Sequence, residues 1–290
     1  MLTLASFIWG STFVAQRMGG DLLRPLTFTF SRSLIAGVVL LSFIAVKSAK
    51  NKTKLRDVFT KDTVVGGLCC AVVLFFATTL QQTGVSMTTA GKAGFLTTIY
   101  IIVVPLLGLF TKKKPPKTIW LSVFIALAGL YLLSVKEGFR IEAGDTLVIL
   151  CAVCFSFHIL VIDHFSQKVN PVGMSCVQFL TVAIVAAPLA FIFEQPKLAD
   201  IAGAWIPLLY TGVLSSSIAF TLQILAQKKL APSVASIIMS LESVFAVLCG
   251  WLVLNETLLL KEGIGCLLMF TAVILAQLPE KANKNRRVAA

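Results

Sequence analysis

Apolar segments of membrane-spanning length fill almost the whole of this 290-residue chain. There are ten of them: residues 2–18, 26–46, 63–82, 92–110, 118–135, 146–163, 172–193, 204–224, 233–254 and 262–278. An α-helix needs about 20 residues to cross a hydrocarbon core of about 30 Å, and each segment has roughly that length. The sequence therefore predicts an all-α integral membrane protein with ten transmembrane helices.

Residues at matching spacings indicate that the chain contains two repeats. Pro25 and Arg32 open the second segment with the spacing by which Pro171 and Gln178 open the seventh. The same shift along the chain aligns Trp9 with Phe155, Thr12 with His158 and Arg17 with Asp163. A slightly shorter shift aligns Gln81 with Gln223, Ala93 with Ala235 and Tyr100 with Glu242. Two nearly constant shifts over four pairs of segments are hard to obtain from apolar composition alone.

A repeat of five helices has a consequence for its orientation. Five is odd, so the second repeat must be inverted in the membrane relative to the first. Inverted repeats are typical of secondary transporters, in which the substrate site lies between the repeats near the bilayer midplane. We therefore expect two inverted five-helix repeats around a central cavity, at residues 1–136 and 144–279, followed by a basic tail at residues 280–290.

Composition and motifs exclude several classes of protein. Hydrophobic residues make up 57% of the chain and charged residues only 13%, against about 25% charged residues in soluble domains. The connections are too short for a soluble catalytic domain, and no phosphate-binding loop is present, which excludes an ATP-driven pump within this polypeptide. No H-E-x-x-H motif, nucleophile elbow or pair of catalytic carboxylates indicates a membrane-embedded enzyme. We expect neither enzymatic activity nor a cofactor.

The basic residues that give the chain its net charge of +12 lie mostly on one side of the predicted membrane. Seventeen Lys and Arg residues lie in the C-terminal tail and in the loops that follow the second, fourth, sixth and eighth segments, which we call the even-numbered loops. Seven lie in the loops on the opposite side. Cytoplasmic loops are the ones enriched in Lys and Arg. We therefore expect a multi-pass protein of the cell membrane with both termini in the cytoplasm, and no nucleic-acid partner.

The seven cysteines all lie within apolar segments. Cys151 and Cys154 form a C-x-x-C pair, but no second pair of ligands accompanies them. We interpret them as small packing residues, without a metal site or redox chemistry.

Glu242 is the most informative polar residue because it lies near the middle of the ninth segment. A carboxyl group at that depth must be protonated, paired or solvated by a cavity. It is either part of a substrate site, where a change of protonation would make protons the coupling ion, or a structural tie between two helices. Its repeat mate is Tyr100, and we expect the two side chains to approach each other near the centre.

Arg32 lies about two turns inside the second segment and has three interpretations. It meets an anionic group of the substrate, pairs with Glu242, or caps the carbonyls of a neighbouring helix. His158 is either functional or a buried packing residue. The candidate substrate-binding residues are Trp9, Thr12, Arg32, Gln81, Tyr100, His158, Gln178, Gln223 and Glu242.

Other polar and helix-breaking residues have simpler interpretations. Ser215, Ser216 and Ser217 are of a type that commonly joins membrane helices by hydrogen bonds, and we favour that role for them. Pro105 and Pro188 are expected to interrupt the fourth and seventh helices.

Two motifs resemble those of a known family. Ile8-Trp9-Gly10-Ser11-Thr12-Phe13 is similar to the opening W-G-S-x-F of the EamA-domain family in the drug/metabolite transporter superfamily. The stretch from Ser240 to Ala246, followed by Gly250-Trp251 and Asn255-Glu256, resembles that family's L-E-P-V-F-A, G-W and G-E positions. The resemblance covers essentially the whole chain and implies the five-plus-five layout.

The chain departs from the family pattern at two positions. Ser243 stands where the family commonly has Pro, which predicts a straighter ninth helix, and Lys114 stands where the first repeat commonly has Glu. Members of the family move amino acids, organic cations, sugars and other metabolites, so the motifs do not identify the substrate.

These observations predict a secondary transporter that works by alternating access and exports a small polar or zwitterionic metabolite, such as an amino acid. Its cavity is expected between the first, third, fourth, sixth, eighth and ninth helices. The alternatives are a carrier of organic cations and a passive channel, although no repeated filter-like sequence favours a channel. Its expected partners are the small-molecule substrate, the lipid bilayer and protons as coupling ion. The sequence leaves the oligomeric state open.

Overall fold

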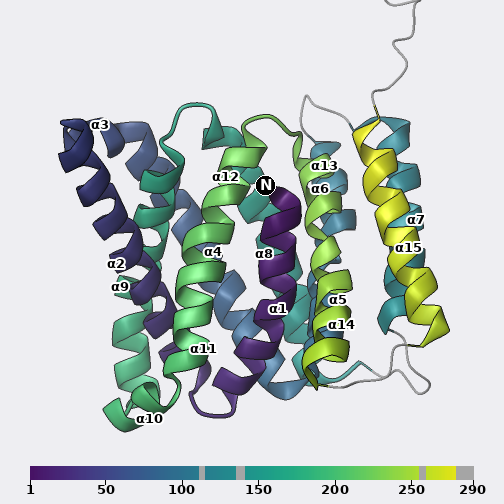
Figure 1. The fold of residues 1–290 in the computed structure, drawn as a ribbon, viewed down its shortest axis with the longest axis horizontal. Coiled ribbons are helices and arrows are strands. Elements are labelled where there is room, and N and C mark those ends of the chain that lie inside the picture. The colour runs from purple at the N-terminus through teal and green to yellow at the C-terminus, as the bar shows by residue number, and fades with distance from the viewer. Residues whose placement is uncertain (111–114, 135–140, 255–258, 279–290) are drawn as a thin grey trace, which may run out of the picture.

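The structure is a computed structural model that describes residues 1–110, 115–134, 141–254 and 259–278 (Figure 1). Within these ranges every regular element is a helix. The first half of the chain contains α1 (Leu2–Gly20), α2 (Pro25–Asn51), α3 (Leu55–Val58), α4 (Lys61–Met87), α5 (Ala90–Thr97), α6 (Tyr100–Gly108) and α7 (Lys117–Ser134). The second half contains α8 (Ala143–Ser166), α9 (Pro171–Phe193), α10 (Leu198–Gly203), α11 (Trp205–Leu209), the π-helix η1 (Tyr210–Ala219), α12 (Phe220–Gln227), α13 (Pro232–Met239), α14 (Leu241–Leu254) and α15 (Leu260–Gln277). The basic tail at 280–290 and the family positions Lys114, Asn255 and Glu256 lie outside the described residues.

The helices confirm an all-α protein with several helices long and apolar enough to cross a membrane. Among the described residues, eight helical stretches have the required length and composition. They are Pro25–Asn51, Lys61–Met87, Gly91–Gly108, Ala143–Ser166, Pro171–Phe193, Trp205–Gln227, Pro232–Cys249 and Leu260–Gln277. The remaining predicted segments, 2–18 and 118–135, form α1 and α7, which are not among these eight. The count of ten membrane spans therefore stays a prediction.

The prolines that mark the repeat open two long helices. Pro25 is the first residue of α2 and Pro171 is the first residue of α9. Proline suits this position because its fixed φ is helical and because the N–H group that it lacks would have no partner there. The next N–H groups of α2 are capped by Glu194, whose carboxylate accepts hydrogen bonds from the N–H groups of Leu26 and Thr27 at 2.9 and 2.7 Å. Since Glu194 directly follows α9, the start of α2 is fixed to the end of α9.

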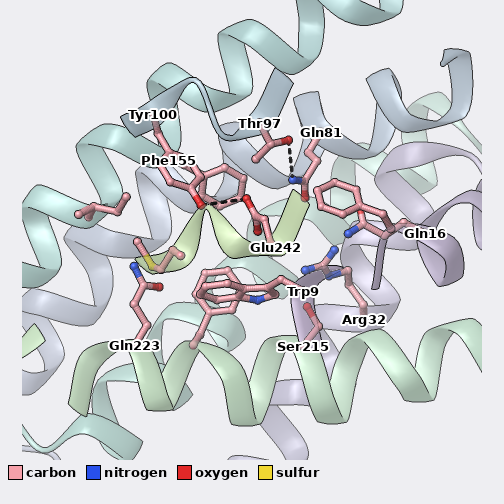
Figure 2. A pocket seen from close by; sticks show the side chains of 14 residues that line it. Trp9, Gln16, Arg32, Gln81, Thr97, Tyr100, Phe155, Ser215, Gln223 and Glu242 are labelled. Carbon is pink, nitrogen blue, oxygen red and sulfur yellow. Dashed lines mark hydrogen bonds between the residues drawn. The ribbon is translucent and has the colours of Figure 1, made fainter. Parts of the chain in front are cut away.

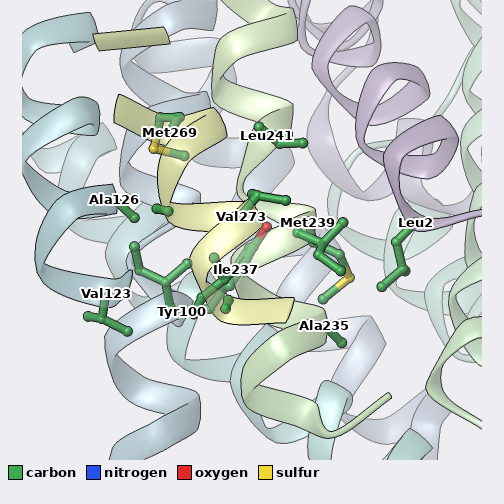
Figure 3. Close-up of a cluster of buried hydrophobic side chains, with 14 of the residues drawn as sticks. Leu2, Tyr100, Val123, Ala126, Ala235, Ile237, Met239, Leu241, Met269 and Val273 are labelled. Carbon is green, nitrogen blue, oxygen red and sulfur yellow. The ribbon is translucent and has the colours of Figure 1, made fainter. Parts of the chain in front are cut away.

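Three helix pairs have the most extensive contacts: α2 with α9, α4 with α8, and α7 with α15. Figure 1 shows α2 and α9 at one edge of the molecule, α7 and α15 at the opposite edge, and α1, α4, α8 and α12 between them. Glycine permits the close approach of α7 and α15, since a Cβ on Gly129 would lie 2.8 Å from the carbonyl oxygen of Gly265. The largest buried cluster joins this edge pair to α6 and α13 (Figure 3). It includes Val123 of α7, Met269 of α15, Ile237 of α13 and the ring of Tyr100.

Two of the apolar segments are interrupted, but not where the prolines predicted. The fourth segment breaks at Thr98 and Ile99, between α5 and α6, whereas Pro105 lies inside α6. The helix α9 continues through Pro188. The expectation of interruptions at these two prolines is therefore wrong.

The ninth segment is also interrupted. It breaks at Ser240, between α13 and α14, although Ser243 had predicted a straighter helix. The Thr98 hydroxyl donates to the carbonyl of Phe95, and the Ser240 hydroxyl donates to the carbonyl of Ile237, each at 2.7 Å. Hydroxyl side chains that bond to backbone carbonyls can compete with the helical pattern, so both breaks share this local feature, although Ser236 makes the same kind of bond inside α13 without a break.

Candidate functional site

A pocket lies between the two halves of the chain, at the level of these two breaks (Figure 2). The empty space inside the pocket, including its open side, is about 490 Å³. The lining residues come from α1, α2, α4, α5 and α6 of the first half and from α8, η1, α12, α13 and α14 of the second. The pocket combines one arginine, one glutamate and three glutamines with aromatic side chains.

Glu242 and Tyr100 meet in this pocket. The Tyr100 hydroxyl donates a hydrogen bond of 2.9 Å to Oε1 of Glu242, and both side chains are buried. This contact confirms the expected approach of the two repeat mates. Oε2 of Glu242 accepts no hydrogen bond from the described residues.

The local backbone explains why Glu242 is tolerated here. Tyr100 is the first residue of α6, and Glu242 is the second residue of α14, so each directly follows a helix break. The first turn of a helix carries partial positive charge, which stabilises a carboxylate. The Ser243 hydroxyl donates to the carbonyl of Gly94 at 3.0 Å and so joins α14 to α5 across the halves.

Gly10 brings α1 against this part of α14. A Cβ at Gly10 would lie 2.6 Å from the carbonyl oxygen of Glu242 and 2.8 Å from the backbone nitrogen of Ala246. Only glycine allows the two backbones to come this close. The W-G pair at the start of the chain therefore has a physical role, because the glycine admits α14 and the tryptophan beside it lines the pocket.

Arg32 is 2% exposed and enters the pocket from α2. Its Nε donates a weak hydrogen bond of 3.3 Å to Oγ of Ser216, and its Nη1 is buried without a partner. Within the part of the chain that the structure describes, Arg32 forms no ion pair with Glu242 and caps no helix carbonyl. Two of the three interpretations of Arg32 are thus not observed in this conformation.

The π-helix η1 places its serines against α2. The Ser217 hydroxyl donates to the carbonyl of Gly212 five residues earlier, at 2.9 Å, and to the carbonyl of Ala36 in α2, at 3.4 Å. Gly212 allows this close contact because a Cβ there would lie 2.7 Å from Cγ2 of Ile35. Ser217 therefore has the helix-joining role expected for the serines. Ser215 differs, since it lines the pocket and its hydroxyl has no partner.

The structure brings six of the nine candidate residues together around the pocket: Trp9, Arg32, Gln81, Tyr100, Gln223 and Glu242. Gln81 donates to the hydroxyl of Thr97 at 3.4 Å, and Gln223 donates to Oε1 of Gln227 at 3.0 Å.

The other three candidates do not line this pocket. The Thr12 hydroxyl donates to the carbonyl of Ile8 in its own helix, at 2.6 Å. Nε2 of His158 lies 3.1 Å from Oε1 of Gln178, so these two residues are hydrogen-bonded to each other.

Several lining residues were not among the candidates from the sequence: Phe13, Gln16, Thr97, Phe155, Ile159, Ser215, Phe220 and Met239. Helical spacing gives a signal for two of them. Phe13 and Gln16 follow Trp9 at the fourth and seventh positions, and therefore lie on the same face of α1. The position of Phe155 as repeat mate of Trp9 is a second signal.

Known proteins resemble this chain over its whole length. The model of the EamA-like transporter family matches residues 1–135 and 142–278. An uncharacterized transporter of Archaeoglobus fulgidus is 32% identical over 278 residues, which cover 96% of this chain and 84% of that protein. The uncharacterized inner membrane transporter YedA of Escherichia coli is 26% identical over 93% of this chain and 87% of its own length.

The fold is also found in a solved protein. A crystal structure with 16% sequence identity covers 100% of this chain and 98% of its own, with a TM-score of 0.77. Both the family match and the relatives span the two halves that line the pocket. The chain belongs to the EamA-like transporter family of the drug/metabolite transporter superfamily, and it is a multi-pass membrane transporter.

Proposed function

We propose that this protein is a secondary transporter that exports a small polar or zwitterionic metabolite, such as an amino acid, by alternating access. The observation that carries the proposal is the pocket between the two halves, at which two interrupted helices meet. Secondary transporters bind their substrates near the midplane, between repeats, with interrupted helices at the site. The six candidate residues that line the pocket form the proposed substrate site.

The pattern of helix contacts supports two inverted repeats. Under the sequence alignment, α2 corresponds to α9 and α7 to α15, and each of these pairs packs together. The contact of α1 with η1 corresponds to that of α8 with α4, and the contact of α1 with α14 to that of α8 with α6. The breaks at Thr98 and Ser240 are themselves repeat mates. On this basis we propose ten transmembrane helices in repeats at residues 1–136 and 144–279.

The orientation in the membrane follows from the basic residues. We propose that both termini and the even-numbered loops are cytoplasmic, because these segments hold most of the Lys and Arg residues.

A carrier of organic cations is the second candidate function. Glu242 favours it, because a carboxylate among aromatic side chains is suited to a cationic group. The buried cation Arg32 in the same pocket argues against it, because a ligand with only positive charge would be repelled there.

Counterflow in proteoliposomes tests the proposed function. Vesicles that contain the purified protein are loaded with a mixture of unlabelled amino acids and diluted into a trace of one labelled amino acid. A carrier exchanges solutes one for another, so we expect transient accumulation of the label above its equilibrium level. Flux that shows no stimulation by the loaded solute, together with ion conductance, would identify a channel instead. Repeating the assay with an imposed pH gradient tests protons as the coupling ion.

A further inference from the structure

Four buried polar atoms that have no hydrogen-bond partner belong to residues that line the pocket. They are Nη1 of Arg32, Nε1 of Trp9, Oγ of Ser215 and Oε1 of Gln16. Arg32, Ser215 and Gln16 are each at most 3% exposed. Buried polar atoms in native proteins are almost always paired with protein, water or ligand. Seven further unpaired buried side-chain atoms belong to described residues that do not line the pocket, whereas these four face a space in which a ligand can complete their hydrogen bonds.

Three of these atoms can donate and therefore favour an anionic group, whereas the fourth, Oε1 of Gln16, is an acceptor. Arginine and the indole N–H are donors only, and the serine hydroxyl can donate. Figure 2 shows Arg32, Ser215 and Gln16 grouped at one end of the pocket, with Trp9 between this group and Gln223. Arginine with additional N–H and O–H donors is a common arrangement for binding a carboxylate. We define Arg32, Trp9 and Ser215 as the donor group.

Glu242 provides the opposite charge in the same pocket. Tyr100 occupies its Oε1, and its Oε2 accepts no hydrogen bond from the described part of the chain. Glu242 and Arg32 form no ion pair with each other, so each charge remains available to a ligand.

We infer that the pocket binds a zwitterion, whose carboxylate is held by the donor group and whose ammonium group is held by Glu242. This inference rests on the proposed function and assigns an orientation to its substrate. A zwitterion satisfies both charges and brings no net charge into the membrane, where net charge is costly. A simple anion would leave Glu242 unpaired, and an organic cation would leave the donor group unpaired.

The apolar walls of the pocket indicate which substituent the zwitterion carries besides its two charged groups. Phe155, Phe220 and Met239 line it, and the rings of Trp9 and Phe220 pack edge to face at 5.1 Å between centroids. An apolar substituent on the zwitterion fits these walls better than a charged one, because it needs no further hydrogen bonds.

Thermal stabilisation of the purified full-length protein tests the inference. A ligand that binds only the folded protein raises its Tm with concentration. Each common amino acid is added in turn, and the one that raises Tm most is compared with its decarboxylated amine and its deaminated acid. For leucine these are 3-methylbutylamine and 4-methylpentanoate. We expect each of the two analogues to bind more weakly than the amino acid, on the order of tenfold, because each leaves one charged group unpaired.

Variants assign the two ends of the zwitterion. Arg32→Gln, Trp9→Phe and Ser215→Ala each remove a donor, so we expect weaker binding of the amino acid and of the deaminated acid, with the amine unaffected. Glu242→Gln should weaken binding of the amino acid and of the amine, with the deaminated acid unaffected. Arg56→Gln is the matched control, because Arg56 is exposed in α3 and outside the pocket. If Arg32→Gln fails to elute as a folded protein in size-exclusion chromatography, the conservative variants Trp9→Phe and Ser215→Ala carry the test.

The inference and the proposed function fail in different ways. The inference is overturned if no amino acid stabilises the protein, or if the donor-group variants bind the deaminated acid as the unmodified protein does. Counterflow of tetraethylammonium without any response to amino acids would keep a transporter and reject the zwitterion. Stabilisation that follows the predicted pattern, in a protein that shows no counterflow, would keep the site and reject the transport mechanism.

Discussion

Among the described residues, the Glu242 carboxyl group accepts one hydrogen bond, from Tyr100, across the boundary between the two halves of the chain. The sequence predicted this contact because the two residues occupy equivalent positions in the repeats. The depth of Arg32 likewise predicted that it lies in a buried polar site. Ser215 was not predicted, because its neighbour Ser217 has the same residue type and joins helices instead. The difference between the two serines depends on the π-helix, which no local sequence pattern indicates.

Tyr100→Phe removes this hydrogen bond and leaves the ring in place. We expect the free energy of unfolding to fall by about 2 kcal/mol, since hydrogen bonds to charged groups contribute about 1.5–3 kcal/mol. Urea or thermal unfolding of the purified protein measures the change. Tyr131→Phe is the control, because Tyr131 is 59% exposed and should show little effect. In a Glu242→Gln background the Tyr100→Phe change should cost less, and equal costs in both backgrounds would show that the two side chains are not coupled.

The helices themselves were easier to predict than their interruptions. Over its described residues, every predicted segment is helical apart from the breaks at 98–99 and 240 and a few residues at segment ends, because a long apolar run specifies a helix regardless of its neighbours. The predicted positions of the breaks were wrong because proline is the best-known helix breaker. In the structure, hydrogen-bonded hydroxyls of Thr98 and Ser240 lie at the interruptions instead. Threonine and serine also occur in uninterrupted helices, so their effect becomes visible only in the folded structure.

Gly10→Ala tests the close contact of α1 with α14. The added Cβ would meet backbone atoms of α14 at less than 3 Å, so one helix must shift. We expect a loss of stability of about 1–3 kcal/mol, the typical cost of overpacking. Gly263→Ala is the matched control, because a Cβ there has no atom within 4 Å. Equal stability of the two variants would contradict the close packing at Gly10.

Asp145 also joins the two halves, near the start of α8. Its Oδ2 lies 2.5 Å from Nζ of Lys92 in α5, and its Oδ1 accepts from the hydroxyl of Thr88 at 2.9 Å. Asp145 itself is fully buried.

Asp145→Asn removes the carboxylate that contacts Lys92, the Thr88 hydroxyl and the backbone N–H of Glu142. We expect the unfolding free energy to fall by about 2 kcal/mol, because hydrogen bonds to charged groups contribute about 1.5–3 kcal/mol and the Lys92 end of the pair is partly exposed. Asp21→Asn is the control, since Asp21 is largely exposed and lies 4.0 Å from Arg17, a geometry that contributes little. A similar small effect of both substitutions in thermal unfolding would argue against a structural role for the Lys92–Asp145 pair.

At the scale of the whole molecule, the distribution of basic residues predicts which side each terminus faces. Residues 280–290 hold four of the Lys and Arg residues that we assign to the cytoplasm. A reporter fused to the C-terminus should therefore be active only as a cytoplasmic fusion. Labelling of a cysteine in this tail from outside intact cells would overturn the orientation that we propose.

The central claim is that the pocket between the halves opens to the two sides of the membrane in turn. Ser215→Cys, in a protein whose seven native cysteines are replaced, places a single thiol in the pocket. Reconstituted vesicles are treated with a membrane-impermeant maleimide, first from one side and then, in a separate sample, from the other. We predict labelling from both sides, and protection from both sides by the amino acid that stabilises the protein. Labelling from one side only, under every substrate and gradient condition, would contradict alternating access through this pocket.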